Sequence, residues 1–479
     1  MTQYPQPQGT QSFSLVQPAV YQNTGSDRYN GNPFIEALDP IREPEELESL
    51  YEVLPPEPTD VTRGRSLTSR RNDLNQLHDV VVLFPQYLTA AEAVNTLIRE
   101  AYHYRNPFST VGRQHRYAQA WAASGQTPIS NWKSTALGHI IMAISGMGKT
   151  TFMHNTLMDF PRVIKHESYH GNPFAVYQIP ILTLRIPHDG TIRSLCVQFF
   201  EQVDELLGTK YAVQAGGRMS IGPMIDLMKQ VATTVSLGLL VIDEVQNLRS
   251  ARSGNAEFVL NLFSEMIEKV GISIVVIATP ALEPVINDSV RNTRKLVSGG
   301  CTIIPPMQRD GIQWQYFTET LWEYQYVKNK TALTETIRGK WHELSGGNSA
   351  FAALLFYMAQ KAEMGGSRER LDEFSFQRAY DANLAFLHPA IQALRSGNPN
   401  DLTKFDDMMV SPRWQHIRSS MGVKELPVKA APGLQTELAG VPEPTNPSES
   451  PKPSKKGSGT AEKIVAPALQ SENPLNVNW

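Results

Sequence analysis

The sequence has few cysteines, no long apolar stretch and little net charge, and each absence excludes a class of protein. Among 479 residues there are 2 cysteines, Cys196 and Cys301, both inside apolar runs. They are typical of small core residues in a reducing compartment rather than of a disulfide framework. No run of about 18 apolar residues occurs, so no membrane-spanning helix is predicted. Residues 1–31 are polar and lack the apolar core of a secretory signal. We therefore expect a cytoplasmic protein with no membrane partner.

Positive and negative charges are nearly balanced, with a formal net charge of −3 at pH 7. A balance so close to neutral gives no overall field that would draw the chain onto nucleic acid. Any contact with nucleic acid must therefore come from a local basic patch.

The chain does contain a glycine-bearing loop between an apolar strand and a helix. The loop reads Ser145-Gly146-Met147-Gly148-Lys149-Thr150-Thr151. It matches the Walker A pattern, except that Ala143 replaces the first Gly. Such a loop turns its N–H groups toward phosphate oxygens, and the helix N-terminus adds partial positive charge. We expect the whole loop to bind ATP, with Lys149 reaching the β- and γ-phosphates and the Thr150 hydroxyl binding Mg²⁺.

A second apolar run ends in two adjacent carboxylates. Leu239–Ile242 is continuously apolar, as a buried parallel strand is, and Asp243 and Glu244 follow it. We expect Asp243 to help bind the nucleotide and hold Mg²⁺, and Glu244 to orient and polarise the attacking water. The carboxylate pair therefore predicts ATP hydrolysis in addition to ATP binding.

Two later segments carry further candidate catalytic side chains. The strand Ile272–Ile277 is followed by Thr279, and a polar residue at this strand tip senses the γ-phosphate in ATPases of this layout. Arg291 and Arg294 are three residues apart, which places them on one face of a helix. That face can complete a neighbouring subunit's site as an arginine finger, or it can be a solvated basic face, and both interpretations remain open.

The order of the expected elements predicts an α/β fold. Apolar strand patterns alternate with amphipathic helix patterns such as Ile192–Leu207 and Ile221–Ala232, which indicates a parallel sheet covered on both sides. After Pro306 the patterns are only helical. This arrangement predicts an AAA+ P-loop sheet flanked by helices and followed by a small helical lid. The turn Ser345–Asn348 in the lid carries no Arg, so no lid arginine can be assigned to the γ-phosphate.

Length and composition predict four segments. Residues 1–74 are expected to form a mostly flexible N-terminal arm, although residues 32–38 are apolar enough to dock. Residues 75–306 are expected to form the AAA+ α/β ATPase domain, and residues 307–424 the lid and C-terminal helices. Residues 425–479, rich in Pro, Ser and Lys, are expected to be a disordered tail that binds a partner.

Two features invite a functional interpretation that we do not favour. His166-Glu167-Ser168-Tyr169-His170 matches the zinc pattern H-E-x-x-H, but its surroundings indicate a loop rather than the helix that the pattern requires. Four arginines at positions 63, 65, 70 and 71 form a basic cluster in the N-terminal arm. We expect the cluster to be solvated, and contact with DNA phosphates is the alternative.

With these motifs placed, the chain resembles the TnsC family, AAA+ regulators of Tn-seven-like transposons that are more distantly related to TniB and MuB. The resemblance runs from about residue 32 to about residue 400 and not into the tails. It rests on Asn32–Leu38, the Walker A loop, Gly238–Ser250, Ile277–Pro280 and His388–Gly397. The stretch that follows the two carboxylates is the most specific of these.

The resemblance implies a function that the residues alone do not give. Members of the family bind ATP, assemble into rings or filaments on double-stranded DNA, and link target-selector proteins to transposase subunits. It also implies that the segment Gly208–Ser220 lines a DNA channel, where Lys210 and Arg218 are the candidate phosphate contacts, and a plain solvent-exposed loop is the alternative. An AAA+ replication initiator or helicase loader is the alternative function, although the polar tail is unlike the winged-helix domain that this class would predict.

Overall fold

The main sheet has five parallel strands in the order β5-β6-β7-β2-β8. The structure is a computed structural model, and it describes residues 15–122, 132–187, 190–217, 219–250, 255–287, 289–396 and 405. The strand bounds are β2 Gly138–Ala143, β5 Ile181–Arg185, β6 Leu239–Asp243, β7 Ser273–Ala278 and β8 Cys301–Ile304. The strand that precedes the Walker A loop, β2, lies between β7 and β8. This is the parallel sheet of AAA+ P-loop ATPases, and it confirms the predicted fold class.

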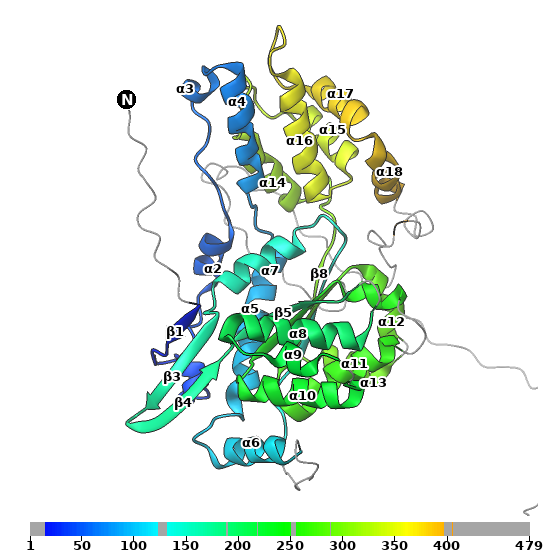
Figure 1. Ribbon diagram of the computed structural model, residues 1–479. Helices are drawn as coiled ribbons and strands as arrows, with labels where there is room; N and C mark the ends of the chain where they lie inside the picture. Colours follow the sequence, from blue (N-terminus) through cyan, green and yellow to red (C-terminus); the bar gives the residue numbers. More distant parts are fainter. Residues whose placement is uncertain are drawn as a thin grey trace, which may run out of the picture. The chain divides into compact units, whose positions relative to one another are not determined.

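Helices cover both faces of this sheet (Figure 1). Alternate strand residues point to opposite faces, so Val241 packs with α5 and α7, while its neighbours Leu240 and Ile242 pack with α8, α10 and α11. The strands are apolar throughout because neither face meets water. The helix bounds are α5 Pro85–His103, α6 Thr110–Ala122, α7 Lys149–Met158, α8 Ile192–Leu207, α9 Tyr211–Ala215, α10 Ile221–Thr234, α11 Asn255–Glu265, α12 Glu283–Asn287 and α13 Val290–Leu296.

A second, three-stranded sheet contains the H-E-x-x-H sequence. Its strands are β1 (Val16–Pro18), β3 (Val163–Tyr169) and β4 (Asn172–Gln178), in the order β1-β3-β4. The sequence was expected to be a loop, but most of it lies on β3, where β-branched residues precede it and an antiparallel partner pairs with it. His166 is buried, with its ring nitrogens 2.9 Å from the Tyr21 hydroxyl and 2.8 Å from Gln178 Oε1. Among the described residues no group of three or more His, Cys, Asp or Glu side chains is placed so that it could hold a metal ion.

The N-terminal segment is more ordered than the sequence predicted. It forms α1 (Pro33–Glu36), α2 (Pro44–Tyr51), α3 (Asp60–Arg63) and α4 (Leu67–Asp73). The widely spaced apolar side chains of α1 and α2 cannot make a core by themselves, but they are buried against α5 and α7, whereas α3 has no buried residue. The expected docking of residues 32–38 is therefore confirmed, with Phe34 and Ile35 at most 3% exposed. The prediction of a mostly flexible arm is wrong for residues 33–73.

The last described part of the chain is helical, as predicted. Its helices are α14 Ile312–Trp322, α15 Glu335–Ser345, α16 Ser349–Glu363, α17 Glu373–Asn383 and α18 His388–Ser396. Trp341 and Phe376 pack in its centre with ring centroids 5.2 Å apart. The predicted tail, residues 425–479, lies outside the described residues.

Residues of the basic cluster bind the N-terminal segment to the lid through an ion pair and hydrogen bonds. The Arg70 side chain is 1% exposed and that of its partner Glu369 is 4% exposed, with an N–O distance of 2.9 Å. Arg70 also donates to the carbonyl oxygen of Tyr326 at 3.0 Å. The expectation of a solvated cluster is wrong for Arg70, because local sequence gives no sign of a carboxylate that lies 299 positions further along the chain.

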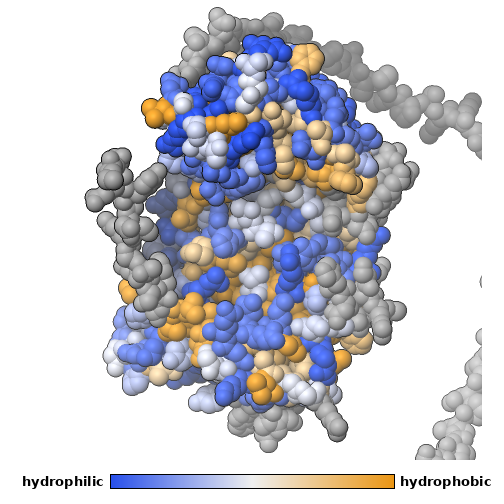
Figure 2. All heavy atoms as spheres, turned by 45° about the horizontal axis from the view of Figure 1, so that its top comes forward, coloured by the Kyte–Doolittle hydropathy of each residue, from blue (hydrophilic) through white to orange (hydrophobic). Residues whose placement is uncertain are grey.

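None of the described helices is long and apolar enough to cross a membrane. On the face that Figure 2 draws, hydrophobic residues reach the surface in several groups among hydrophilic ones.

Replacing Glu369 with Gln should destabilise the protein strongly. The substitution leaves the Arg70 guanidinium buried without a counter-charge, and the expected loss is about 3–5 kcal/mol in the free energy of unfolding. Chemical denaturation measures it. The control is Glu335→Gln, which breaks the ion pair between Glu335 and Arg338. The Glu335 side chain is 85% exposed, so this loss should lower the free energy of unfolding by at most about 1 kcal/mol. Equal losses in the two variants would contradict the assigned role of the Arg70–Glu369 pair.

Candidate nucleotide site

The glycine-bearing loop connects β2 to α7 and adopts the conformation that its glycines permit. Gly146 and Gly148 have φ of 85° and 84°, in the left-handed region that side-chain-bearing residues avoid. Gly148 is the N-cap of α7 and supplies no side-chain cap, so the first N–H groups of the helix face the loop without one. Ala143 is the last residue of β2 and 1% exposed, so the missing first Gly falls in the strand and not at the turn.

Lys149 folds back over the loop that precedes it. Its Nζ donates to the carbonyl oxygens of Ala143 at 2.8 Å and Ile144 at 3.0 Å. The carbonyl of Met147 accepts a hydrogen bond from the Tyr87 hydroxyl at 2.5 Å. Lys149 and Tyr87 thus both bind carbonyl oxygens of the loop. The ammonium group of Lys149 stays close to the N-terminus of α7, and this arrangement suits phosphate binding.

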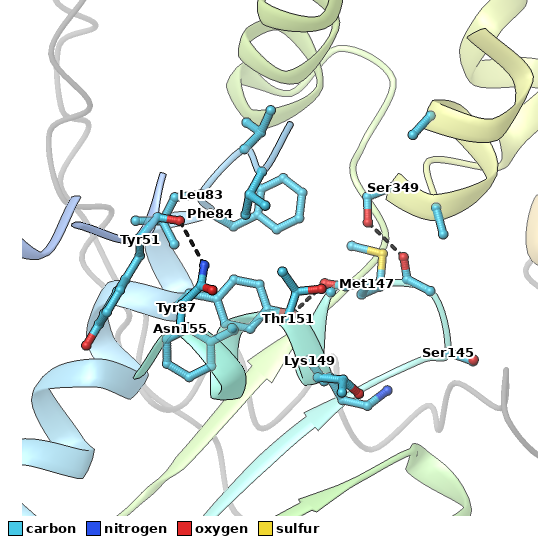
Figure 3. Close-up of a pocket in the computed structure, with 18 of the residues that line it drawn as sticks. Tyr51, Leu83, Phe84, Tyr87, Ser145, Met147, Lys149, Thr151, Asn155 and Ser349 are labelled. Atoms are coloured by element: carbon cyan, nitrogen blue, oxygen red, sulfur yellow. Dashed lines mark hydrogen bonds between the residues drawn. The ribbon is translucent and has the colours of Figure 1, made fainter. Parts of the chain in front are cut away.

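A cavity of about 450 Å³ opens beside this loop (Figure 3). Its walls come from four parts of the chain: the N-terminal segment, the loop with α7, the ends of β6 and β7, and the lid. All seven predicted loop residues, Ser145 to Thr151, line the cavity, and so do Asp243, Glu244 and Thr279. The structure therefore brings together the residues that three separate motifs predicted.

The carboxylates lie where β6 ends. Asp243 is the last residue of the strand, and its Oδ1 accepts from the backbone N–H of Glu244 at 2.8 Å. Glu244 has φ of 58°, an uncommon value for a residue with a side chain. Its Oε1 accepts from Arg185 at 3.2 Å, and its Oε2 from the Gln246 amide at 2.5 Å.

Two residues that contact Glu244, Arg185 and Gln246, were not predicted from the sequence as site residues. Arg185 ends β5 and lies directly opposite Asp243 in the strand register. The sequence feature that could have identified Arg185 is its position, since β5 ends in this charged residue just as β6 ends in Asp243. Gln246 follows the carboxylates by two positions, a spacing that carries no chemical signature by itself.

Thr279 lies at the end of β7 and is 2% exposed. Its Oγ1 is buried and has no hydrogen-bond partner among the residues that the structure describes. A buried hydroxyl without a partner is energetically unfavourable, and this one lines the cavity. A ligand oxygen in the cavity would satisfy it.

The residues present fit ATP and Mg²⁺. The Thr150 hydroxyl and the Asp243 carboxylate line the same cavity and are oxygen ligands of the kind that Mg²⁺ prefers. Mg²⁺ at nucleotide sites typically takes one or two protein ligands and completes its shell with phosphate oxygens and water. Such a site does not need a larger cluster of metal-ligating side chains.

The lid contacts the phosphate loop directly at the N-terminus of α16. Asn348 donates to the carbonyl of Ser145 at 2.8 Å, and the Ser349 hydroxyl donates to that of Gly146 at 2.8 Å. The backbone N–H of Ala350 also donates to the Gly146 carbonyl, at 2.9 Å. A Cβ on Gly146 would lie 2.6 Å from Asn348 Oδ1, so this close approach requires glycine. The turn Ser345–Asn348 carries no arginine, and the lid contacts the phosphate loop through the Asn348 amide, the Ser349 hydroxyl and the N-terminus of α16.

The far wall of the cavity was not predicted from the sequence. It is formed by residues 80–84 with Tyr51, His78, Tyr87 and Asn155. Figure 3 shows Tyr51, Leu83, Phe84 and Tyr87 on the side of the cavity away from Lys149. Tyr87 stacks on Phe152 with ring centroids 4.6 Å apart. Apolar and aromatic side chains opposite a phosphate loop suit a nucleobase.

Arg291 and Arg294 lie on α13, as predicted, and both are exposed. The Arg291 side chain is 77% exposed and comes within 3.9 Å of Glu268. Neither arginine lines the cavity of its own chain.

Of the two predicted DNA contacts, Lys210 is exposed at the N-terminus of α9 and Arg218 lies outside the described residues. The segment was expected to be a loop, but Tyr211–Ala215 is a short helix. Its first N–H groups are capped from a distance, because the Asp204 carboxylate accepts from Tyr211 and Ala212 at 2.8 Å.

Comparisons with known proteins agree with this site in part of the chain. A protein-family model described as an AAA domain matches residues 133–286, which include the loop, the carboxylates and Thr279. No curated protein matches the sequence.

Among solved structures, the chain is similar to a Walker-type ATPase, paby2304, of Pyrococcus abyssi, at 12% identity over 60% of this chain and 76% of that one, with a TM-score of 0.35. It is also similar to the ORC2 protein of Aeropyrum pernix in its ADPNP–ADP complexes, at 15% identity over 72% and 88%, with a TM-score of 0.36. It is also similar to the Thermotoga maritima RuvB Holliday junction branch migration motor, at 9% identity over 56% of this chain and 67% of that one, with a TM-score of 0.29. Likenesses this distant carry no argument about function.

Replacing Asn348 with Ala should weaken nucleotide binding in addition to weakening α16. Asn348 caps that helix by accepting from the N–H groups of Ala350 and Phe351, so its loss should cost about 0.5–2 kcal/mol of stability. The lost contact with Ser145 should weaken nucleotide affinity by about 1 kcal/mol, or about fivefold. Calorimetric titration with an ATP analogue measures it.

The matched control is Thr334→Ala, which removes the cap of α15 without touching the loop. It should cost similar stability and leave nucleotide affinity unchanged. Equal affinities in the two variants would show that the Asn348 contact does not support the site.

Proposed function

We propose that the chain binds ATP with Mg²⁺ and hydrolyses it to ADP and phosphate. The observation that carries the proposal is the single cavity lined by Lys149, Asp243, Glu244 and Thr279, which come from three different strand ends. Binding alone would need only the loop. A carboxylate pair and an unpartnered hydroxyl at the same cavity are features that hydrolysis needs.

Each residue takes a role that its chemistry allows. The backbone N–H groups of the loop, from Ser145 to Thr151, hold the phosphates, and Lys149 neutralises their β- and γ-charge. Thr150 and Asp243 would hold Mg²⁺, which supplies charge neutralisation at the transferred phosphate when bound. Glu244 orients and polarises the attacking water, and the Thr279 hydroxyl contacts the γ-phosphate. Arg185 donates to one oxygen of Glu244, and the acceptor sites that remain on the carboxylate can accept from water.

We further propose that the chain is a transposition regulator of the TnsC kind. On this proposal it is a cytoplasmic protein that assembles on double-stranded DNA as a ring or filament and couples a target selector to transposase subunits. The support is the sequence resemblance, above all in Gly238–Ser250. Phosphate contacts by Lys210 and Arg218 would make its DNA binding insensitive to base sequence. The match of residues 133–286 to an AAA domain is consistent with this proposal and equally with other AAA+ functions.

Two single substitutions separate binding from hydrolysis. Lys149→Ala should abolish ATP binding, because the backbone cradle lacks its compensating charge. Glu244→Gln should retain ATP binding and lose turnover, because an amide cannot act as a base for water. Nucleotide titration and phosphate release measure the two steps. The ATPase proposal fails if Lys149→Ala binds ATP like the wild type or if Glu244→Gln turns over normally.

Arg291 and Arg294 should act on a neighbouring subunit. Because neither lines its own cavity, replacing both with Ala should leave ATP binding nearly intact and abolish any rise of turnover with protein concentration. Mixing this double variant with Lys149→Ala protein should recover some hydrolysis, since the first offers an intact loop and the second intact arginines. If mixed assemblies form and remain inactive, α13 carries a solvated basic face.

A further inference from the structure

Gln246 connects the ends of two neighbouring strands with one side chain. It belongs to the 3-10 turn Val245–Ser250 that follows the carboxylates. Its Nε2 donates to Glu244 Oε2 at 2.5 Å, and its Oε1 accepts from the backbone N–H of Thr279 at 3.3 Å. The side chain lines the cavity and is half-buried.

The turn is anchored so that this side chain faces the cavity. Val245 and Leu248 are 0% and 1% exposed and pack in the core on the α8 face of the sheet. Asn247 fixes the turn to the end of β5 by donating to the carbonyl of Ile186 at 2.9 Å. Gln246 is therefore presented at the strand ends by a turn with its own supports.

The two partners of Gln246 require a side chain that both donates and accepts a hydrogen bond. A carboxylate only accepts hydrogen bonds, and a backbone N–H only donates, so the residue between them must donate on one side and accept on the other. Because the Thr279 N–H can only donate, the amide oxygen of Gln246 faces it. The NH₂ group of the same amide then faces Glu244.

Glu244 needs such a support. Its backbone is in the left-handed region, and its side chain is 33% exposed, so packing does not fix the carboxylate. The other partner, Arg185, has a side chain that is 62% exposed, and exposed ion pairs hold a geometry only weakly.

We propose that Gln246 is the positioning residue that holds the Glu244 carboxylate in register with the γ-phosphate end of the site. It would also transmit movements of the β7 end at Thr279 to Glu244. This inference rests on the proposed ATP hydrolysis. It predicts a loss in the chemical step and not in ATP binding, because neither hydrogen bond of Gln246 involves the phosphate loop.

Gln246→Met tests the proposal, since Met has a similar length and makes neither hydrogen bond. We expect kcat for ATP hydrolysis to fall by about 10- to 100-fold, while the Kd for an ATP analogue changes by less than about twofold. Gln246→His, which keeps a donor and an acceptor, should recover a large part of the lost kcat. Asn247→Ala is the matched control, because it removes a side-chain hydrogen bond of the same turn that does not involve Glu244, and it should reduce kcat less.

A double-variant cycle distinguishes action through Glu244 from an independent role. In a Glu244→Gln background, Gln246→Met should lower the residual single-turnover rate no further. The inference is overturned if Gln246→Met retains kcat within about twofold of the wild type, if Asn247→Ala causes an equal loss, or if the effects in the cycle add. Those outcomes are separate from failure of the ATPase proposal, in which Glu244→Gln itself would turn over normally.

Discussion

The site depends on the parallel alignment of five strands. Because all five run in one direction, their carboxyl ends meet at one edge of the sheet. The register pairs Arg185 with Asp243 and Met142 with Ala278, so the phosphate loop, the carboxylates and Thr279 emerge side by side. Antiparallel pairing of any one of these strands would carry its terminal residue to the opposite edge. The chemistry of the site is in this sense a consequence of sheet topology.

Elements outside the sheet complete the cavity. The N-terminus of α16 binds two carbonyls of the phosphate loop, and the chain from Tyr51 to Tyr87 supplies the aromatic wall. Both are joined to each other by the buried Arg70–Glu369 pair. A movement of the phosphate loop on nucleotide binding would therefore move the N-terminus of α16 through the hydrogen bonds of Asn348 and Ser349. This gives a physical route from the nucleotide to the outer helices without an arginine in the turn Ser345–Asn348.

Much of this site could be predicted from the sequence because its residues follow short, continuous patterns. The loop, the pair Asp243 and Glu244, and Thr279 each come directly after an apolar run that reads as a buried strand. Apart from Gln246, which follows Glu244 by two positions, the remaining contributors lie far away in sequence from what they touch. Arg185 reaches Glu244 across 59 positions, Tyr87 reaches Met147 across 60, and Asn348 reaches Ser145 across 203. Local patterns do not specify such contacts. The N-terminal segment was misjudged for the same reason, since its sparse apolar residues form a core only with distant partners.

The central claim is that this site becomes an active ATPase between subunits assembled on DNA. Electron microscopy of the full chain with an ATP analogue, with and without duplex DNA, tests it most directly. The account predicts ordered assemblies that form with duplex DNA, nucleotide at the loop of Lys149, and Arg291 or Arg294 of one subunit near the γ-phosphate of its neighbour. Single copies under both conditions, or nucleotide bound away from the loop, would contradict it.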